Sequence, residues 1–375
     1  MPPSLQSSSA QPLVRRYDVA LLDLDGVVYV GADAVPGVPE ALAKTRAAGM
    51  RLAFVTNNAA RPPAAVAAHL SELGIPAAAA EVITSAQAAA HYLAERLPAS
   101  SPVLVVGTTG LVEALRERGL RPVFSADDEP AAVVQGYSPG LDWRQLAEGA
   151  VAIRRGVPWV ATNLDPTVPS PRGPLPGNGS LVAALRHATG ALPVSTGKPD
   201  PAMHRESVER SGAERPIVVG DRLDTDIEGA TAVGCASLLV LSGVTKPDDL
   251  LMAPPDLRPD FIARDVTGLL QVHAPPQWSD GRACYGQWQA SAAADELHLD
   301  ARPSPAGAAD RPVDDDLDAL RALCAAAWRA LDTRHADEPG ASPAGRPGDA
   351  TRRGQHWRFR ADGHAAEMLR SLGLS

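Results

Sequence analysis

The sequence predicts an α/β protein built on a parallel sheet, with a smaller α/β domain inserted into it and a small α+β unit appended at the C-terminus. Short apolar runs alternate with amphipathic, alanine-rich segments over residues 19–271, which is the pattern of repeated βα units. Polar motifs that follow some of these runs cluster in two stretches, residues 23–58 and 198–226. The segment between the two stretches has predicted strands and helices of its own. After Pro275-Pro276 the alternation stops, which indicates a domain boundary.

The expected strands are short apolar runs bounded by glycine, proline or polar residues. They are Val19–Leu22, Leu52–Val55, Val103–Val106, Ala132–Gln135, Pro158–Ala161, Ile217–Val219, Ser237–Leu241 and a final short strand at Asp260–Ala263. A strand that is apolar throughout is typical of a parallel sheet buried on both faces. Functional polar side chains should therefore follow its C-terminal end.

Several expected helices carry start and stop signals. Proline stands in the first turn at Pro62 and Pro201, and glycine follows the last turn at Gly49 and Gly74 among others. The expected helices are Pro39–Ala48, Pro62–Leu73, Ser85–Arg96, Gly110–Arg118, Asp142–Arg154, Gly179–Ala188, Pro201–Ser211, Thr225–Val233 and Val266–Val272.

These elements divide the chain into four parts. They are a flexible tail (1–16), a core (17–83 and 197–273), an inserted domain (84–196) and a C-terminal appendage with flexible linkers (274–375). The loop 165–179 is rich in proline and glycine and is the most irregular part of the inserted domain. We expect it to face the substrate.

The appendage is expected to centre on a helix over Asp314–Arg334, whose leading aspartates complement the helix dipole. Segments 301–312 and 337–351 are predicted linkers, residues 357–361 alternate like a strand, and 363–372 could form a closing helix. Such a mixture would permit an acyltransferase-like remnant. However, the pyrophosphate loop Gln/Arg-x-x-Gly-x-Gly/Ala is absent, so a packing or dimerisation unit is the favoured interpretation.

Composition excludes several classes of function. The formal net charge of -9 argues against binding to nucleic acid or to an anionic membrane surface. The chain has three widely spaced cysteines without a Cys-x-x-Cys pair, which fits a reducing compartment. No apolar run approaches the roughly 18 to 20 residues that a membrane span needs. We therefore expect a soluble, cytoplasmic protein.

The first polar motif is Asp23-Leu24-Asp25-Gly26, directly after a buried strand. Residues two apart in a strand point to the same side, so the two carboxylates can act together. Without a cation they would repel each other, and one would retain a proton. An ordinary Asp-x-Asp-Gly turn is the alternative. The further ligands of an EF-hand are missing at the required spacing.

Two later motifs could complement these carboxylates. Thr56-Asn57-Asn58 follows the next strand and could bind an anionic oxygen, or could simply form a cap and a turn. Lys198 stands between Gly197 and Pro199 just before a helix, where the chain often approaches an anion. The alternative for a lone lysine is a solvated surface charge, and a phosphate loop of the Walker type is excluded by the spacing.

The last motif is Gly220-Asp221-Arg222-Leu223-Asp224-Thr225-Asp226. Asp224 and Asp226 could serve as N-terminal residues of a helix. Asp221 lies directly at a strand end, so it is less easily explained in that way. Together the four motifs supply several carboxylates, a hydroxyl, amides and one ammonium at strand ends. This set favours Mg²⁺ over Zn²⁺ and suits phosphoryl transfer.

The order Asp-x-Asp-Gly-Val, Thr-Asn-Asn, Gly-Lys-Pro and Gly-Asp-x-x-x-Thr-Asp resembles the haloacid dehalogenase-like (HAD) superfamily of phosphatases. It is most similar to class IIA, the nitrophenylphosphatase, phosphoglycolate phosphatase and glycerol 3-phosphate phosphatase type. The resemblance covers about residues 17–272. It implies a Rossmann-like core with an α/β cap of the C2 type, and an aspartate at position 25 implies a phosphatase rather than a dehalogenase.

The resemblance also implies a role for each motif residue. Asp23 would be the nucleophile that forms an aspartyl-phosphate, and Asp25 the acid and then the base. Thr56 and Lys198 would complete the catalytic set. Phosphate would be bound by Thr56, Asn57, Asn58, Gly26 and Lys198, and Mg²⁺ by Asp23, Asp25 (through its main-chain carbonyl), Asp221 and Asp226.

The expected function is Mg²⁺-dependent hydrolysis of a small phosphorylated metabolite, with glycerol 3-phosphate favoured and 2-phosphoglycolate next. The loop 165–179 contains no aromatic residue that could stack on a base or a pyridine ring. A homodimer is compatible with this expectation. The alternative is a non-catalytic, phosphatase-like regulator that works through its C-terminal unit. The complete set of five motif residues, Asp23, Asp25, Thr56, Lys198 and Asp221, speaks against that alternative.

Overall fold

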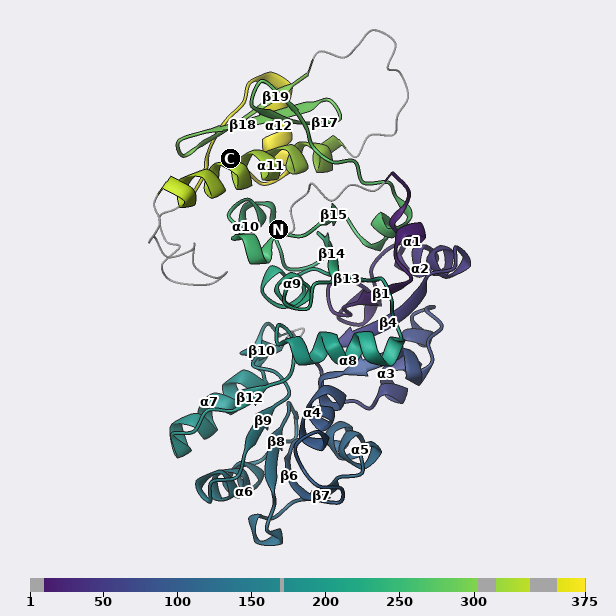
Figure 1. Cartoon of the computed structure of the whole chain (residues 1–375), viewed down its shortest axis with the longest axis vertical. Coiled ribbons are helices and arrows are strands. Elements are labelled where there is room, and N and C mark those ends of the chain that lie inside the picture. The colour runs from purple at the N-terminus through teal and green to yellow at the C-terminus, as the bar shows by residue number, and fades with distance from the viewer. Residues whose placement is uncertain (1–9, 169–171, 303–314, 338–355, 375) are drawn as a thin grey trace. The chain divides into compact units, whose positions relative to one another are not determined.

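The structure is a computed structural model that describes residues 10–168, 172–302, 315–337 and 356–374 (Figure 1). The chain divides into two compact units, residues 18–216, and residues 1–17 together with 217–375. The division into core, inserted domain and appendage remains a prediction.

The unit 18–216 begins with a parallel three-stranded arrangement that carries two of the polar motifs. Strand β1 (Val19–Leu22) pairs with β4 (Arg51–Thr56), and β4 pairs with β5 (Val82–Thr84). Helices α2 (Val38–Ala47) and α3 (Pro63–Glu72) connect these strands, and a small ribbon of β2 (Tyr29–Val30) and β3 (Asp33–Ala34) follows β1. Both faces of β1 are buried, so the first polar side chains follow its C-terminal end.

A second parallel sheet in this unit has the strand order β12-β9-β8-β6-β7. Its strands are β6 (Pro102–Val106), β7 (Arg121–Val123), β8 (Ala132–Gln135), β9 (Trp159–Ala161) and β12 (Val194–Ser195). The covering helices are α4 (Ser85–Ala94), α5 (Thr109–Glu117), α6 (Trp143–Arg154) and α7 (Asn178–Thr189).

Helices cover both faces of this second sheet (Figure 1). Val103 and Val105 of β6 pack with α4 and α5, whereas Leu104 and Val106 pack with α6 and α7. This alternation follows from the two-residue period of a strand. A hairpin of β10 (Thr167–Val168) and β11 (Leu175–Pro176) leads into α7, and α8 (Pro201–Ser211) ends the unit.

The other unit contains a parallel set of β13 (Pro216–Gly220), β14 (Ala236–Val240) and β15 (Phe261–Ala263). Short helical segments connect them, namely a π-turn (Leu223–Ile227), α9 (Glu228–Ala232), α10 (Pro247–Leu251) and a 3-10 turn at Pro255–Leu257. A further 3-10 turn, Val266–Leu270, follows β15. Residues Leu13–Arg16 form helix α1. Leu13 is fully buried and its N–H donates to the Gln271 carbonyl, so the last four residues of the expected tail are ordered by packing.

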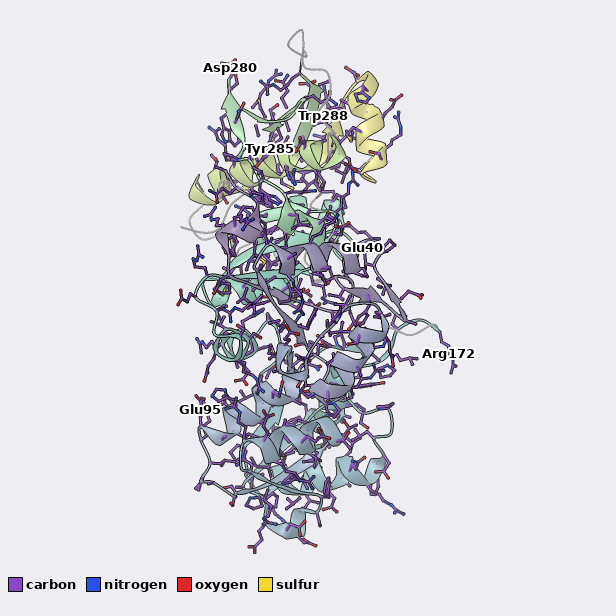
Figure 2. The ribbon with its side chains drawn as sticks, turned by 90° about the vertical axis from the view of Figure 1, so that its right-hand side faces the viewer. Glu40, Glu95, Arg172, Asp280, Tyr285 and Trp288 are labelled. Carbon is purple, nitrogen blue, oxygen red and sulfur yellow. The ribbon has the colours of Figure 1, made fainter. Side chains whose placement is uncertain are left out.

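The C-terminal part of this unit is a five-stranded sheet with two helices. Strands β16 (Gln277–Ser279), β17 (Arg282–Tyr285), β18 (Trp288–Ala293) and β19 (Glu296–Ala301) form an antiparallel meander, and β20 (Arg358–Arg360) adds in parallel to β19. The helices are α11 (Asp315–Asp337) and α12 (Gly363–Ser371). Tyr285 and Trp288, labelled in Figure 2, are paired across neighbouring strands. Both are buried in the same apolar cluster as α11.

Helix α11 joins the appendage to the preceding part of its unit. The guanidinium of Arg258 lies 2.8 Å from the carboxylate of Asp332, and the indole N–H of Trp328 donates to the Leu250 carbonyl at 2.9 Å. Leu239 of β14 and Ile262 of β15 belong to the same apolar cluster as α11. The appendage therefore shares a hydrophobic core with residues 217–270.

Most expected elements are confirmed within one or two residues. The strands β5 and β7 and the meander 277–301 were not predicted, since they are short or mix polar with small residues. The expected helix Thr225–Val233 is a π-turn followed by α9, and Val266–Val272 is a 3-10 turn. Nearly all of the two predicted linkers lies outside the described residues. No helix in the described part of the chain combines the length and the apolar character needed to cross a bilayer.

Candidate active site

Asp23 and Asp25 follow β1 in a tight turn. Gly26 has a φ of 85°, a value that favours glycine, and its N–H donates to the Tyr29 carbonyl at 2.9 Å. Asp25 as a whole residue is exposed to solvent, but protein atoms around its carboxyl still raise its pKa by desolvation, and the charges of Lys198, Arg61 and His69 oppose this shift. The backbone of this motif is therefore a turn, as the alternative interpretation expected. The same turn places the two carboxylates near cationic groups.

Lys198 is a buried residue, so the surface-charge alternative is wrong. Its Nζ lies 2.6 Å from Oδ1 of Asp23, with side-chain exposures of 3% and 14% respectively. The same ammonium lies 3.5 Å from the carbonyl oxygen of Val55 on β4. The buried ammonium and the largely covered carboxylate compensate each other at this short distance.

Thr56 and Asn58 form a turn, which was one of the two interpretations of this motif from the sequence. The Oγ1 of Thr56 accepts the Asn58 N–H at 3.1 Å, and Oδ1 of Asn58 accepts the Ala60 N–H at 2.8 Å. Helix α3 starts only at Pro63, so Thr56 does not cap it. The Thr56 hydroxyl is buried at the C-terminal end of β4, at the same end of the paired strands as Asp23.

Asn57 connects this turn to two other segments. Its Oδ1 accepts the Lys198 N–H at 2.8 Å, and its Nδ2 lies 3.2 Å from both the Lys198 carbonyl oxygen and Oδ2 of Asp165. The Asn57 carbonyl accepts hydrogen bonds from Asn163 at 2.7 Å and Ser85 at 2.6 Å. Asn163 was not predicted as a site residue, and Asp165 was expected only as the first residue of the loop 165–179. Their position directly after β9 is the signal that could have revealed them.

Gly197 is required by close packing. A Cβ at this position would lie 2.2 Å from the Thr162 carbonyl oxygen and 2.8 Å from Oδ1 of Asn57. Glycine therefore allows the Lys198 segment to approach both Asn57 and the segment after β9.

The motif after β13 contains two fully buried carboxylates in the other unit. Asp221 accepts the Val244 N–H at 2.6 Å, and Asp226 accepts the Arg222 N–H at 3.2 Å. One carboxylate oxygen of each aspartate lies within 4.8 Å of one from the other. Asp224 instead forms an ion pair with Arg222 at 2.9 Å. Two neighbouring buried carboxylates favour either a bound proton or a cation, and oxygen donors suit a hard cation.

Close packing also holds these two aspartates in place. A Cβ on Gly220 would lie 2.2 Å from the Cβ of Asp226, and a Cβ on Gly243 would lie 1.9 Å from Oδ2 of Asp221. Both glycines therefore allow the main chain to approach the carboxylates closely.

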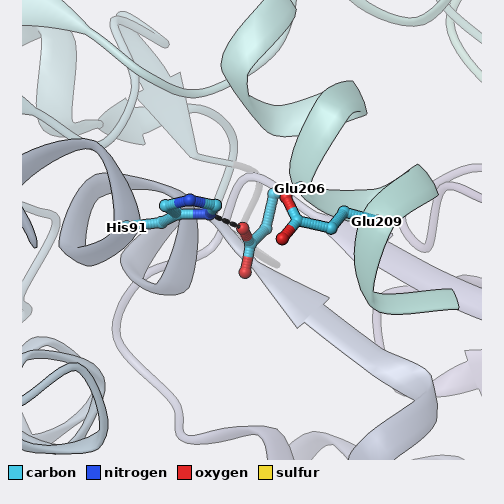
Figure 3. Close-up of side chains that lie close together, drawn as sticks. All are labelled: His91, Glu206 and Glu209. Carbon is cyan, nitrogen blue, oxygen red and sulfur yellow. Dashed lines mark hydrogen bonds and ion pairs between the residues drawn. The ribbon is translucent and has the colours of Figure 1, made fainter. Parts of the chain in front are cut away.

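A second group of titratable side chains lies on α4 and α8 (Figure 3). His91 comes from α4, and Glu206 and Glu209 from α8, with potential ligand atoms within 4.8 Å. However, the buried Glu206 already pairs with His91, with Arg118 at 2.7 Å and with Arg210 at 3.4 Å. Two adjacent guanidinium groups oppose a bound cation. We therefore assign this cluster as an ion-pair network between helices.

Comparison with known proteins supports the interpretation of the motifs. Residues 20–121 match a haloacid dehalogenase-like hydrolase family model, and residues 195–269 match a second HAD-hydrolase-like model. D-glycerol 3-phosphate phosphatase of Mycobacterium tuberculosis is 45% identical over 325 residues, which cover 85% of this chain and 88% of that protein. An acid sugar phosphatase of Staphylococcus aureus is 35% identical, over 63% of this chain and 91% of that protein.

Solved structures agree with these relatives. The crystal structure of a glycerol phosphate phosphatase of Mycobacterium tuberculosis in complex with magnesium has a TM-score of 0.82 and 40% identity, covering 97% of this chain and 100% of that one. A p-nitrophenyl phosphatase of Archaeoglobus fulgidus has a TM-score of 0.63 and 30% identity, covering 68% of this chain and 98% of that one. The predicted fold class is confirmed.

Residues 285–346 match a GCN5-related N-acetyltransferase-like domain model. The rejection of an acyltransferase-like relationship was therefore wrong, because it relied on a single missing loop motif rather than on the pattern of the whole unit.

The family models, the relatives and the solved structures agree with the ordered motifs. The chain belongs to the haloacid dehalogenase-like hydrolases and is a phosphatase of class IIA.

Proposed function

We propose that this phosphatase hydrolyses glycerol 3-phosphate, with 2-phosphoglycolate as the next candidate, through a phosphorylated Asp23. The observation that carries the mechanism is the 2.6 Å contact between Lys198 and Asp23. An ammonium next to a nucleophilic carboxylate would stabilise the negative charge of an incoming phosphoryl group. The choice of substrate is supported by the 45% identity to D-glycerol 3-phosphate phosphatase and by the lack of aromatic residues in the loop 165–179.

The proposed reaction has two steps. A carboxylate oxygen of Asp23 attacks phosphorus, the bond from phosphorus to the ester oxygen breaks, and the Asp25 carboxyl donates its proton to the leaving alkoxide. Asp25 then accepts a proton from a water molecule that attacks the same phosphorus, which releases inorganic phosphate and restores Asp23. A raised pKa of Asp25 favours the protonated form that the first step needs.

Binding of the phosphoryl oxygens is proposed for the turn after β4 and for Gly26. The Thr56 hydroxyl, the main-chain amide of Asn57 and Asn58 would donate hydrogen bonds, while Lys198 would supply positive charge. Gly26 permits the main chain to turn beside Asp25.

The metal ligands are proposed from the donor chemistry and from the family. Asp221 and Asp226 provide two buried carboxylates, which suits Mg²⁺, and Asp23 together with the main-chain carbonyl of Asp25 would complete the protein ligands. When bound, Mg²⁺ neutralises part of the charge of the phosphoryl group.

The test is phosphate release from a panel of phosphorylated metabolites, with Mg²⁺ and with EDTA. We expect Mg²⁺-dependent release with the highest kcat/KM for glycerol 3-phosphate. Asp23→Asn should abolish it while the protein remains folded, which a cooperative thermal unfolding transition would show. If the wild type releases no phosphate from 4-nitrophenyl phosphate or from any metabolite, the catalytic proposal fails in favour of a non-catalytic regulator.

A cytoplasmic location and a homodimer are further proposals. The three cysteines are unpaired by disulfides, which supports a reducing compartment. On the second sheet of the unit 18–216, Leu192 and Val194 are exposed at 71% and 44%, next to and on the strand β12 at one end of the sheet order. An exposed apolar sheet edge supports self-association. Light scattering after size exclusion would give the mass of the particle, and a monomer over a wide concentration range would contradict the dimer.

A further inference from the structure

The side chain of Asn57 holds the main chain of Lys198 at two points. Its Oδ1 accepts the Lys198 N–H at 2.8 Å, and its Nδ2 donates to the Lys198 carbonyl oxygen at 3.2 Å. One planar amide thus satisfies both polar groups of a single residue. Rotation of the main chain at Lys198 would break both hydrogen bonds.

Lys198 depends on such support because it lies in a turn between β12 and α8. A lysine side chain is flexible, so its ammonium stays at one point only when its main chain and its partner are both fixed. Here the partner is the carboxylate of Asp23 at 2.6 Å. The main-chain support comes from Asn57, and Gly197 makes the close approach possible.

The same amide also reaches the segment after β9. Nδ2 of Asn57 lies 3.2 Å from Oδ2 of Asp165, and the Asn57 carbonyl accepts the Asn163 side chain at 2.7 Å. Asn163 is in turn fixed by Asn178, whose side chain donates to the Asn163 carbonyl at 2.8 Å. Three segments distant in sequence therefore meet at Asn57.

We propose that Asn57 is a positioning residue, whose side chain places the ammonium of Lys198 on Asp23 and links that placement to the segment Asn163–Asp165. The role of Lys198 in turnover rests on the proposed function, whereas the placement itself does not. This assignment differs from phosphate binding by the Asn57 main-chain amide, because the side-chain amide acts on the protein chain. Movement of the Asn163–Asp165 segment would then alter the position of Lys198.

The first experiment measures the accessibility of Lys198 without turnover. The chain contains three lysines, Lys44, Lys198 and Lys246, of which Lys44 and Lys246 are exposed. Acylation with limiting acetic anhydride, followed by peptide mass spectrometry, gives the rate at Lys198 relative to the other two. Asn57→Ala should raise this relative rate about 10-fold, since each lost hydrogen bond changes an equilibrium by roughly 2- to 10-fold.

Three further variants calibrate the measurement. Asp23→Asn removes the ion pair and should also raise the rate at Lys198. Asp165→Ala removes one of the two acceptors of Asn57 Nδ2 and should raise it by a smaller factor, about 2-fold. Asn178→Ala is the matched comparison, because it deletes a buried amide that acts on Lys198 only through Asn163 and Asn57, and it should raise the rate by no more than about 2-fold. An unchanged rate in Asn57→Ala, or an equal rise in Asn178→Ala, would overturn the proposal.

The second experiment is a double-mutant cycle on turnover of 4-nitrophenyl phosphate with Mg²⁺. Asn57→Ala should lower kcat by about 10- to 100-fold, as misplacement of a catalytic group does, while KM changes less than about 3-fold. In the Lys198→Met background the same substitution should change kcat by less than about 2-fold, since the group that Asn57 positions is gone. Equal losses in both backgrounds would show that Asn57 acts independently of Lys198. An inactive wild type with a normal labelling response would contradict the proposed function and leave the placement intact.

Discussion

The ammonium of Lys198 lies 2.6 Å from the carboxylate of Asp23, and both side chains are almost closed to solvent. Lys198→Met should lower kcat for phosphate release by about 10²–10³-fold, because it removes a preorganised charge at the point where the phosphoryl group would bind. Steady-state kinetics with 4-nitrophenyl phosphate measure this loss. Lys44→Met, at an exposed position on α2, is the control and should retain wild-type turnover. Comparable losses in both variants would contradict the assigned role.

Asp25→Asn should affect substrates according to their leaving groups. Turnover of glycerol 3-phosphate should fall by about 10²–10⁴-fold, since its alkoxide needs a proton. Nitrophenolate leaves without one, so a rapid-quench experiment should show a burst of about one nitrophenolate per enzyme molecule, followed by slow hydrolysis. A uniform loss for both substrates, without a burst, would contradict the acid and base roles of Asp25.

Glu206→Gln should destabilise the unit 18–216. The carboxylate is 1% exposed and lies 2.7 Å from Arg118 and 3.4 Å from Arg210. Its removal leaves partly buried guanidinium groups without their partner, and we expect a loss of about 1–3 kcal/mol in the free energy of unfolding. Glu209→Gln, at an exposed position on the same helix, should change it by less than about 0.5 kcal/mol. Urea denaturation of both variants makes the comparison, and equal effects would contradict the network.

The pair of Arg46 and Glu81 should contribute acid-sensitive stability. Burial opposes ionisation of Glu81, but the Arg46 guanidinium at 2.7 Å and the Ala78 N–H together lower the pKa of this carboxyl. A lowered pKa stabilises the folded state above the unfolded value of about 4.3, and this contribution is lost as the pH falls through the folded value. Glu81→Gln should therefore cost up to about 1 kcal/mol at neutral pH, because the pair is partly exposed.

The measurement for this pair is the free energy of unfolding of the wild type and the variant between pH 3 and pH 7. The difference should shrink at the acid end. Arg46→Met should reproduce the flatter pH profile of Glu81→Gln. A difference that is constant across the range would contradict the assignment.

Removal of residues 274–375 should destabilise the remaining chain rather than release an independent phosphatase. The appendage shares an apolar cluster with Leu239, Leu250 and Ile262, and the deletion would expose these residues. We expect aggregation or a much lower thermal unfolding temperature. A soluble truncated protein with an unchanged unfolding temperature would contradict this. The comparison needs only the two chains and a thermal scan.

The motifs allowed the family and the chemistry to be predicted, because the carboxylates and Thr56 each follow a recognisable apolar run and Lys198 stands just before a recognisable helix. The burial of Lys198 could not be predicted, since its partners Asp23 and Val55 are distant in sequence. The side-chain role of Asn57 was missed for the same reason. Asn163 and Asp165 also follow a strand, so the same rule applied consistently would have included them.

The strands of the C-terminal meander were not predicted, for a different reason. Strand Trp288–Ala293 is rich in alanine and Glu296–Ala301 carries acidic residues, and local propensity favours neither in strands. Pairing with neighbouring strands and packing on α11 stabilise them instead.

The central claim is that Asp23 becomes phosphorylated. The most direct measurement is acid quenching of Asp25→Asn during turnover of 4-nitrophenyl phosphate with Mg²⁺, followed by mass spectrometry of the tryptic peptide 17–44. The account predicts one added phosphoryl group located at Asp23, and no such product in Asp23→Asn. Nitrophenol release that proceeds without any phosphorylated form of this peptide would contradict it.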